Sequence, residues 1–342
     1  MRKTLTSVVI ALAGFVSTSY GQQDPQFTQF MHCKLAYNPA YAGTSEAICF
    51  NALYRQQWVS FPGAPKTGLF SFDMPLLSTF GVGLTVMNDQ LGFDNTTSAR
   101  AAFAFHRNIG NGKFSIGLDA GILQKKINGT WVAPQTLNDP SIPSNPVQGA
   151  LGGTNSPALN KLSPDFGIGL YYTIPGKMYV GISASHIVAQ DLKGKTAASI
   201  AASGGNPAIP GYALNFQMAR HYYVIAGYTF QVAGGDGELT PNVKVKSDGA
   251  STQLDVNLTY MHMKRVWFGA SYRMQDAIAP MLGAVIPNVG KGSLKIGYSY
   301  DVTTSKIKGY SSGTHEIMLG YCFNKIDNTK IQSHGNVRFL ED

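Results

Sequence analysis

Histidines and cysteines are the side chains of this chain that most often carry chemistry, and their spacing forms no established motif. The histidines are dispersed over the whole chain, at His32, His106, His186, His221, His262, His315 and His334. Because serine is frequent as well, a Ser–His pair for lipid hydrolysis could form, but no catalytic triad signature accompanies it. The cysteines lack the spacing of a zinc site. The sequence therefore predicts no catalytic residue, no cofactor and no metal, and a protein that is not an enzyme.

The number of cysteines is odd, so an exported chain would keep at least one of them unpaired. Cys33 and Cys49 could form a disulfide because both lie near the start of the mature chain. The alternative is that Cys33, Cys49 and Cys322 are all small apolar fillers, and we favour that alternative.

Charged side chains on the polar faces of strand-like segments are stronger candidates for a site. They are three arginines and three aspartates: Arg55, Arg100, Arg273, Asp73, Asp119 and Asp255. One interpretation is a charged constriction or ligand site in a lumen. The other is internal salt bridging that holds a closed barrel without a pore. We favour salt bridging because the sequence shows no ring of one sign.

Alternation with a period of two residues runs through most of the chain and indicates which elements position those charges. In FGVGLTVMND and KFSIGLDAGIL, which begin at Phe80 and Lys113, large apolar residues alternate with small or polar ones. Segments of about ten residues with this alternation are typical of transmembrane β-barrels. Charged residues make up only 13% of the chain, about half of their usual share in soluble domains. Both observations favour an apolar face that meets lipid.

We therefore predict an all-β fold, a closed antiparallel outer-membrane β-barrel of about 14 strands. About fifteen segments qualify as strands, among them 211–219 and 222–231, whereas bacterial single-chain barrels have even numbers. Either one segment is not a strand, or two segments merge, or one strand pairs differently. No stretch after the first residues reaches the roughly 18 apolar residues of a transmembrane helix.

The chain divides into four predicted parts. Residues 1–21 form a cleaved signal peptide, with Arg2 and Lys3 before a short apolar run. The other parts are an N-terminal periplasmic or plug segment at 22–46, the barrel at 47–324 and a polar C-terminal tail at 325–342.

Two long connections, 124–163 and 189–210, are candidates for the external surface, because long barrel loops usually face outward. The net charge of +8 is scattered rather than concentrated. This scatter argues against nucleic acid as a partner and is compatible with contact to outer-membrane lipid.

The segment 22–46 is predicted to contain one short amphipathic helix. Asp24 is a candidate N-cap and Pro25 the first helical residue. Four apolar residues follow at helical spacing on one face: Phe27, Phe30, Met31 and Leu35. They either pack inside the barrel or bind a periplasmic partner, and an apolar stripe usually has an intramolecular home.

Longer motifs make the sequence more specific. They include QQDPQFTQFMHCKLAYNPAYAG at 22–43, NALYRQQWVSFPGAPKTGLFSFDMPL at 51–76, WFGASYRMQDA at 267–277 and GTHEIMLGY at 313–321. In order and spacing, from about residue 22 to 324, these motifs resemble the PorP/SprF family, which is found with the type IX secretion system of Bacteroidetes.

The resemblance implies a non-enzymatic outer-membrane component of the secretion and gliding system. Such a protein would bind secreted adhesins by their C-terminal targeting domain and help to export them or anchor them at the cell surface. Periplasmic type IX components and a peptidoglycan-associated protein are the other implied partners. Two alternatives remain open, a general diffusion channel for small solutes and, less favoured, a barrel lipid hydrolase.

Overall fold

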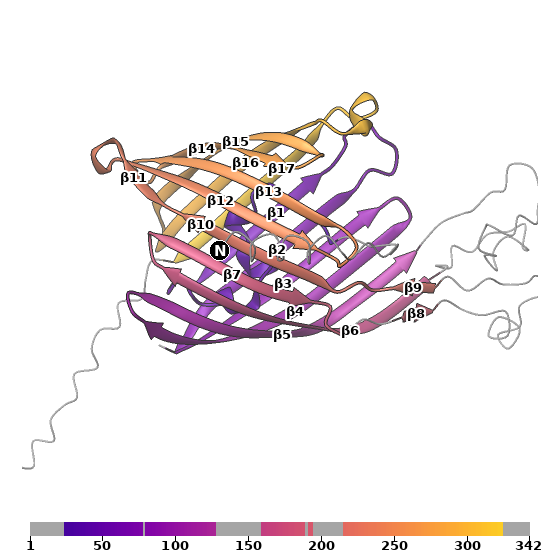
Figure 1. The fold of residues 1–342 in the computed structure, drawn as a ribbon, viewed down its shortest axis with the longest axis horizontal. Helices are drawn as coiled ribbons and strands as arrows, with labels where there is room; N and C mark the ends of the chain where they lie inside the picture. Colours follow the sequence, from indigo (N-terminus) through magenta and orange to yellow (C-terminus); the bar gives the residue numbers. More distant parts are fainter. Residues whose placement is uncertain (1–23, 78, 128–158, 189–190, 194–214, 324–342) are drawn as a thin grey trace, which may run out of the picture.

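Fourteen antiparallel strands close into a barrel, as the sequence predicts (Figure 1). The computed structural model describes residues 24–77, 79–127, 159–188, 191–193 and 215–323. The first half of the wall comprises β1 (Cys49–Gln56), β2 (Lys66–Leu77), β3 (Phe80–Leu91), β4 (Asp94–Ile109), β5 (Gly112–Ile127), β6 (Leu159–Ile174) and β7 (Met178–Ser185). The second half comprises β10 (His221–Tyr228) with β11 (Phe230–Val232), β12 (Gly237–Ser247), β13 (Thr252–His262), β14 (Val266–Arg273), β15 (Ala277–Val289), β16 (Gly292–Thr303) and β17 (Thr314–Phe323).

Two pairings show that the sheet has no free edge. β1 pairs with β17, and β10 pairs with both β7 and β12. β10 and β11 both pair with β12, so together they act as one wall strand. The surplus candidate at 211–219 contains β9 (Asn215–Gln217), which pairs outside the wall with β8 (Asp191–Lys193). The even number expected of a bacterial barrel is therefore confirmed.

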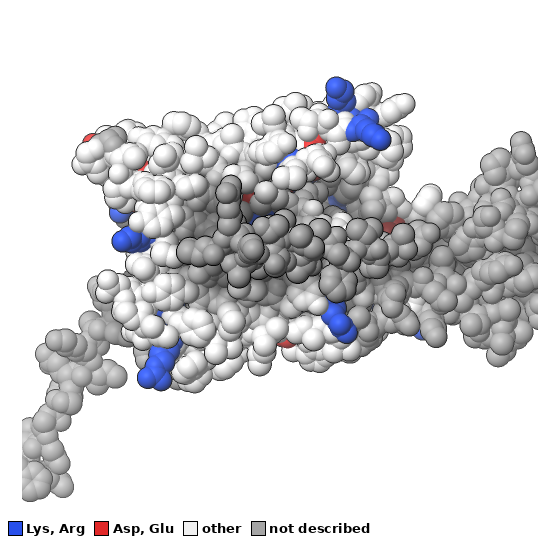
Figure 2. Space-filling view, in the orientation of Figure 1, with Lys and Arg blue, Asp and Glu red and all other residues white. Residues whose placement is uncertain are grey.

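The outer surface of the wall is apolar. Leu118, Ile182, Phe268 and Leu282 are each more than half exposed, and they stand for many large apolar side chains on alternate positions of the strands. Figure 2 shows that the Lys and Arg side chains of one face lie toward the two ends of the barrel. An apolar band between charged ends fits a bilayer, as expected of a transmembrane β-barrel. Among the described residues, no helix has the length and hydrophobicity to cross a membrane.

The two ends of the barrel differ. At the end where β1 begins and β17 finishes, successive strands are joined by short turns such as 110–111, 175–177 and 290–291. Longer connections, 57–65 and 304–313, leave from the other end, as do the connections from β5 to β6 and from β7 to β10. Short turns face the periplasm in bacterial barrels, so we call the first end periplasmic and the second external. Most of the predicted external loops, and residues 1–21 and 325–342, lie outside the described residues.

Residues 24–46, the plug segment, lie in the barrel lumen. The predicted single helix is not confirmed, because three 3₁₀ turns take its place: η1 (Phe30–His32), η2 (Lys34–Ala36) and η3 (Pro39–Tyr41). A continuous helix would need amide-to-carbonyl bonds along the segment. Instead, the amides of Phe27, Thr28 and Gln29 donate to the Tyr37 hydroxyl and the Glu316 carboxylate.

The cysteine predictions are wrong in two respects. Cys49 forms a disulfide with Cys322, whereas Cys33 is free and buried. Neither the Cys33–Cys49 bond nor the interpretation of three unpaired fillers holds. The register of β1 on β17 places Cys49 directly opposite Cys322. That proximity arises only from barrel closure, so the spacing of the cysteines along the chain could not reveal it.

Candidate functional site

The lumen is the candidate site, because many buried polar side chains of the wall contact the plug segment there. The segment runs along the lumen from Asp24, near His186 and His221 at the external ends of β7 and β10, to Glu46, near Lys113 at the periplasmic start of β5. Inward-facing glycines leave room for it. A Cβ at Gly117 would collide with the backbone of Ala40, and one at Gly81 with the carbonyl of Ala42.

A network of buried ion pairs crosses the lumen beside Thr28. Arg55 lies 2.7 Å from an Asp301 oxygen and 3.0 Å from a Glu316 oxygen. Arg273 lies 3.1 Å from Asp301 and 3.4 Å from Asp255. The network continues to Lys244, whose amine lies 2.7 Å from Asp255. All six of these side chains are 3% exposed or less, so removal of one would leave a charge without its partner in a dry environment. We call these six residues the central network.

The central network also binds the plug segment directly. Glu316 accepts hydrogen bonds from the amides of Thr28 and Gln29, at 2.8 and 2.7 Å. The Thr28 hydroxyl donates to Asp301, and Lys244 donates to the carbonyl oxygen of Phe27. Barrel charges thus satisfy backbone groups that a helix would have satisfied internally.

The remaining predicted charges hold the periplasmic half of the segment. Arg100 donates to the carbonyl oxygen of Ala36 at 2.9 Å and lies 3.6 Å from Asp119. Asp73 accepts a hydrogen bond from the amide of Gly43 at 3.1 Å. All six charges selected from the sequence therefore face inward. They form salt bridges or plug contacts, and carboxylates and cations alternate.

The apolar stripe of the plug segment is also inside the barrel. Phe27, Phe30, Met31 and Leu35 are at most 8% exposed, and the first three belong to one cluster with Trp267 and Met318 of the wall. A partner could reach these side chains only if the segment left the lumen. Their role in partner binding stays a prediction, and the buried contacts account for the stripe.

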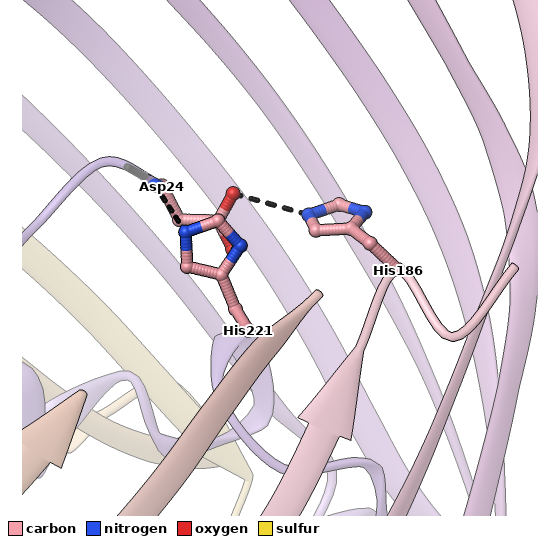
Figure 3. A group of neighbouring side chains, drawn as sticks. All are labelled: Asp24, His186 and His221. Carbon is pink, nitrogen blue, oxygen red and sulfur yellow. Dashed lines mark hydrogen bonds and ion pairs between the residues drawn. The ribbon is translucent and has the colours of Figure 1, made fainter. Parts of the chain in front are cut away.

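Asp24 fastens the external end of the plug segment (Figure 3). One carboxylate oxygen lies 3.1 Å from His186 Nε2, and the other accepts a 2.6 Å hydrogen bond from the Tyr223 hydroxyl. The Asp24 amide donates to His221 Nε2. Burial opposes the charge of Asp24, but the two histidines outweigh burial and hold its pKa well below the usual value. Burial also opposes the charge of His186, yet Asp24 and Asp165 raise the pKa of that imidazole to about 10. Asp24 and His186 therefore form a charged pair at neutral pH.

Asp24, His186 and His221 are close enough to share a metal ion, since their ligand atoms lie within 4.8 Å of one another. Their hydrogen bonds argue against it. His221 Nε2 accepts from the Asp24 amide while Nδ1 faces the Ala219 carbonyl, and His186 Nδ1 faces Asp165. His221 would have to give up one of its two partners to bind a metal, whereas His186 could keep Asp165 and would exchange only its contact with Asp24. In the structure the three side chains bind one another, and we call this cluster the clasp.

A Ser–His pair does exist, between His106 and Ser115. The Oγ of Ser115 lies 2.7 Å from His106 Nδ1, and both side chains are buried against the plug segment. His106 Nε2 has no hydrogen-bond partner among the described residues, so no carboxylate orients the ring. Without an orienting group or access for substrate, the pair lacks the arrangement of a hydrolase.

Several important residues escaped the sequence analysis. Lys244, Asp301 and Glu316 alternate with outward apolar neighbours just as the selected arginines do, and extending the same search to lysine and glutamate would have found them. Asp24, His186 and His221 carry no such signal, because none of them lies inside a long alternating run and their proximity depends on barrel closure.

The sequence matches a family model described as type IX secretion system membrane protein PorP/SprF over residues 19–321. No curated protein matches it significantly. Among solved structures, the TodX deltaS2S3 mutant monoaromatic hydrocarbon channel is similar, with a TM-score of 0.51 at 12% identity over 85% of this chain and 94% of that chain. The Ralstonia pickettii toluene transporter TbuX is similar with a TM-score of 0.48 at 12% identity, over 91% of this chain and 97% of that chain. At 12% identity, the likeness to the TodX deltaS2S3 mutant channel shows the barrel fold alone.

Proposed function

The chain belongs to the PorP/SprF family of type IX secretion system membrane proteins, and from this premise we infer that it works by binding rather than by conducting or catalysing. Its external end holds secreted proteins by their C-terminal targeting domain and helps to export them or anchor them at the cell surface. Its periplasmic end contacts periplasmic type IX components and a peptidoglycan-associated protein.

The observation that carries this proposal is the occupied lumen. The plug segment is fixed from Asp24 to Glu46 by charged contacts on several strands, including Lys246, Arg55, Arg100 and Asp73. A diffusion channel needs a continuous wet path. A binding platform needs a rigid barrel, and the buried ion pairs and plug contacts provide rigidity.

The described external loops offer part of a binding surface. Loops 57–65 and 304–313 are joined by backbone hydrogen bonds between Val59 and residues 312 and 313. Phe61 and Tyr310 remain exposed on them, at 40% and 74%. Exposed aromatic side chains on a supported loop pair are typical anchors of protein interfaces.

Co-purification tests the proposal. The detergent-extracted barrel should retain a tagged C-terminal targeting domain from an adhesin of the same organism. The double variant F61A/Y310A should retain less, because its anchors are gone while the barrel wall is unchanged. A variant at the lipid-facing Leu118, L118A, is the matched control and should bind as wild type does.

Conductance separates binding from diffusion. The purified barrel in a planar bilayer should show no steady current, whereas a variant lacking residues 22–36 should conduct if it still migrates as a folded barrel. A steady open pore in the intact protein, together with failure to retain the targeting domain, would favour the diffusion channel and overturn the proposal.

A further inference from the structure

A cavity of about 430 Å³ lies at the periplasmic end, between the plug segment and the wall. Its lining includes His32 and Lys34 from the plug segment, Trp267 of β14 and Lys295 of β16. Lys177, in the turn after β6, lies at its edge. We call His32, Lys34, Trp267 and Lys295 the basic cavity.

The lysines of the basic cavity differ from the other lysines inside the barrel. Lys113, Lys125 and Lys244 each lie within ion-pair distance of a carboxylate. Within the described part of the chain, neither Lys34 nor Lys295 has a hydrogen-bond or ion-pair partner. Lys34 instead lies 3.7 Å above the ring of Tyr179, a contact that favours a cation but leaves its three N–H groups unmatched.

Two further polar groups point to an absent ligand. Trp267 is 2% exposed, yet its indole Nε1 has no acceptor among the described residues. The Nε2 of His32 is likewise buried without a partner, and its ring lies 4.9 Å from that of Trp267. Buried polar groups are nearly always satisfied in folded proteins, and an orphan donor calls for an unseen ion or ligand.

The charge balance identifies the chemistry of that ligand. The cavity is lined by three lysines and by one carboxylate, Glu238, which already accepts a hydrogen bond from Gln231. Burial and the charge of Lys295 lower the pKa of Lys34 to about 7. An anion beside Lys34 would reverse that effect and hold the ammonium charged.

We propose that the basic cavity binds an oxyanion, a carboxylate or phosphate group that enters from the periplasm. The two ammonium groups supply charge, and Trp267, in the wall of the same cavity, contributes an N–H donor that has no acceptor among the described residues. The volume accommodates one such group with part of its parent molecule. The site does not depend on the external surface and is separate from client binding.

Fluorescence of Trp267 reports occupancy directly. The folded protein carrying W58F and W131F retains Trp267 as its one tryptophan. Titration of this protein with inorganic phosphate, and separately with sodium acetate, should give a saturable change for the oxyanion class that fits. A saturable change with phosphate alone, or with acetate alone, identifies the class of oxyanion that binds. The absence of saturation with both ligands overturns the proposal.

Charge-removing variants test whether the lysines are responsible. K34M and K295M should each weaken binding at least tenfold, whereas K66M, which removes an exposed lysine at the external end of β2, should leave it unchanged. Heat-modifiable migration on gels checks that each variant is folded, and K34Q replaces K34M if the latter is not. Equal affinity in K34M, K295M and K66M would overturn the proposal.

The pH dependence gives an independent readout. Binding should weaken between about pH 6 and pH 9, because Lys34 must be protonated to hold the anion and its pKa in the empty cavity is about 7. The groups that face Lys34 are His32, Lys295, Cys33, Tyr41 and Tyr179, and Glu238 and Lys177 line the same cavity. Affinity that is constant over this range would contradict a role for Lys34.

Discussion

The central network and the basic cavity both hold cations inside the barrel, yet they treat charge in opposite ways. In the central network, each arginine or lysine has a carboxylate within 3.4 Å. In the basic cavity, Lys34 and Lys295 have none in the described part of the chain, and the pKa of Lys34 falls to about 7. Paired charges fix a structure, whereas unpaired ones keep a desolvation cost that an anionic ligand would offset. The difference separates the part of the lumen that holds the plug segment from the part that we propose binds an oxyanion.

The largest effect should come from breaking the central network. R55M leaves Asp301 and Glu316 buried with less compensation, so the free energy of unfolding should fall by about 3–5 kcal/mol. Urea unfolding of the barrel in lipid vesicles, or the temperature at which its gel migration changes, measures this. K66M serves as the control for loss of one positive charge at the same end. A stability equal to that of the control would mean that the network is not holding the plug.

A smaller loss should follow from opening the clasp at Asp24. D24N removes a charged hydrogen-bond acceptor, so the free energy of unfolding should fall by about 1.5–3 kcal/mol. The substitution should also abolish part of the pH dependence of this free energy. The low pKa of Asp24 stabilises the fold above pH 3.8, and this contribution is lost as pH falls below that value. The raised pKa of His186 stabilises the fold fully below pH 6.5, and this stabilisation is lost as the pH rises to about 10.

The wild type minus D24N difference in unfolding free energy should therefore be largest between about pH 4 and 6.5. Measurement of both proteins from pH 3 to pH 10 checks the window. A difference that grows toward pH 10 would contradict the charged pair.

An oxyanion that binds in the basic cavity should stabilise the folded protein by mass action. Phosphate or acetate at ten times its dissociation constant should raise the free energy of unfolding by about 1.4 kcal/mol. The same concentration should have no such effect on K34M. A stabilisation shared equally by wild type and K34M would be a general salt effect.

The smallest expected effect is that of K295M, which should not lower the free energy of unfolding as R55M does. K295M removes an unpaired cation from β16, so we expect stability to stay unchanged or to rise by up to about 1 kcal/mol. K244M makes the same substitution in the central network and should destabilise, because Asp255 loses a partner at 2.7 Å. If both variants lost stability equally, the contrast between the two regions would not hold.

The sequence was most informative where one local rule repeats. Period-two alternation predicted the wall, because each strand must present one face to lipid and one to the lumen. The even strand number of bacterial barrels showed that fifteen candidates could not all be separate wall strands, but only the structure identified 211–219 as the surplus one. The alternation also placed Arg55 and Arg273 correctly on the inner face. Helical spacing, a different local rule, failed for the plug segment. Phe27, Phe30 and Met31 do share one apolar cluster, but the amides of Thr28 and Gln29 bind Glu316 instead of helix carbonyls.

Other features depend on contacts between distant parts of the chain. The clasp joins Asp24 to His186 and His221, and the basic cavity joins Lys34 to Lys295. Neither pair shares a local pattern, because each forms only when the wall closes around the plug. A single sequence carries no record of that proximity, so these sites required the structure.

The bond between Cys49 and Cys322 spans 273 residues and makes nearly the whole wall a covalent ring. A protease at the cell surface that cuts one external loop would open the ring without releasing a fragment. Strands on both sides of the cut would stay tethered, and the nicked protein would separate into two pieces only after reduction. A single cleavage in an external loop therefore leaves all strands of the barrel covalently linked.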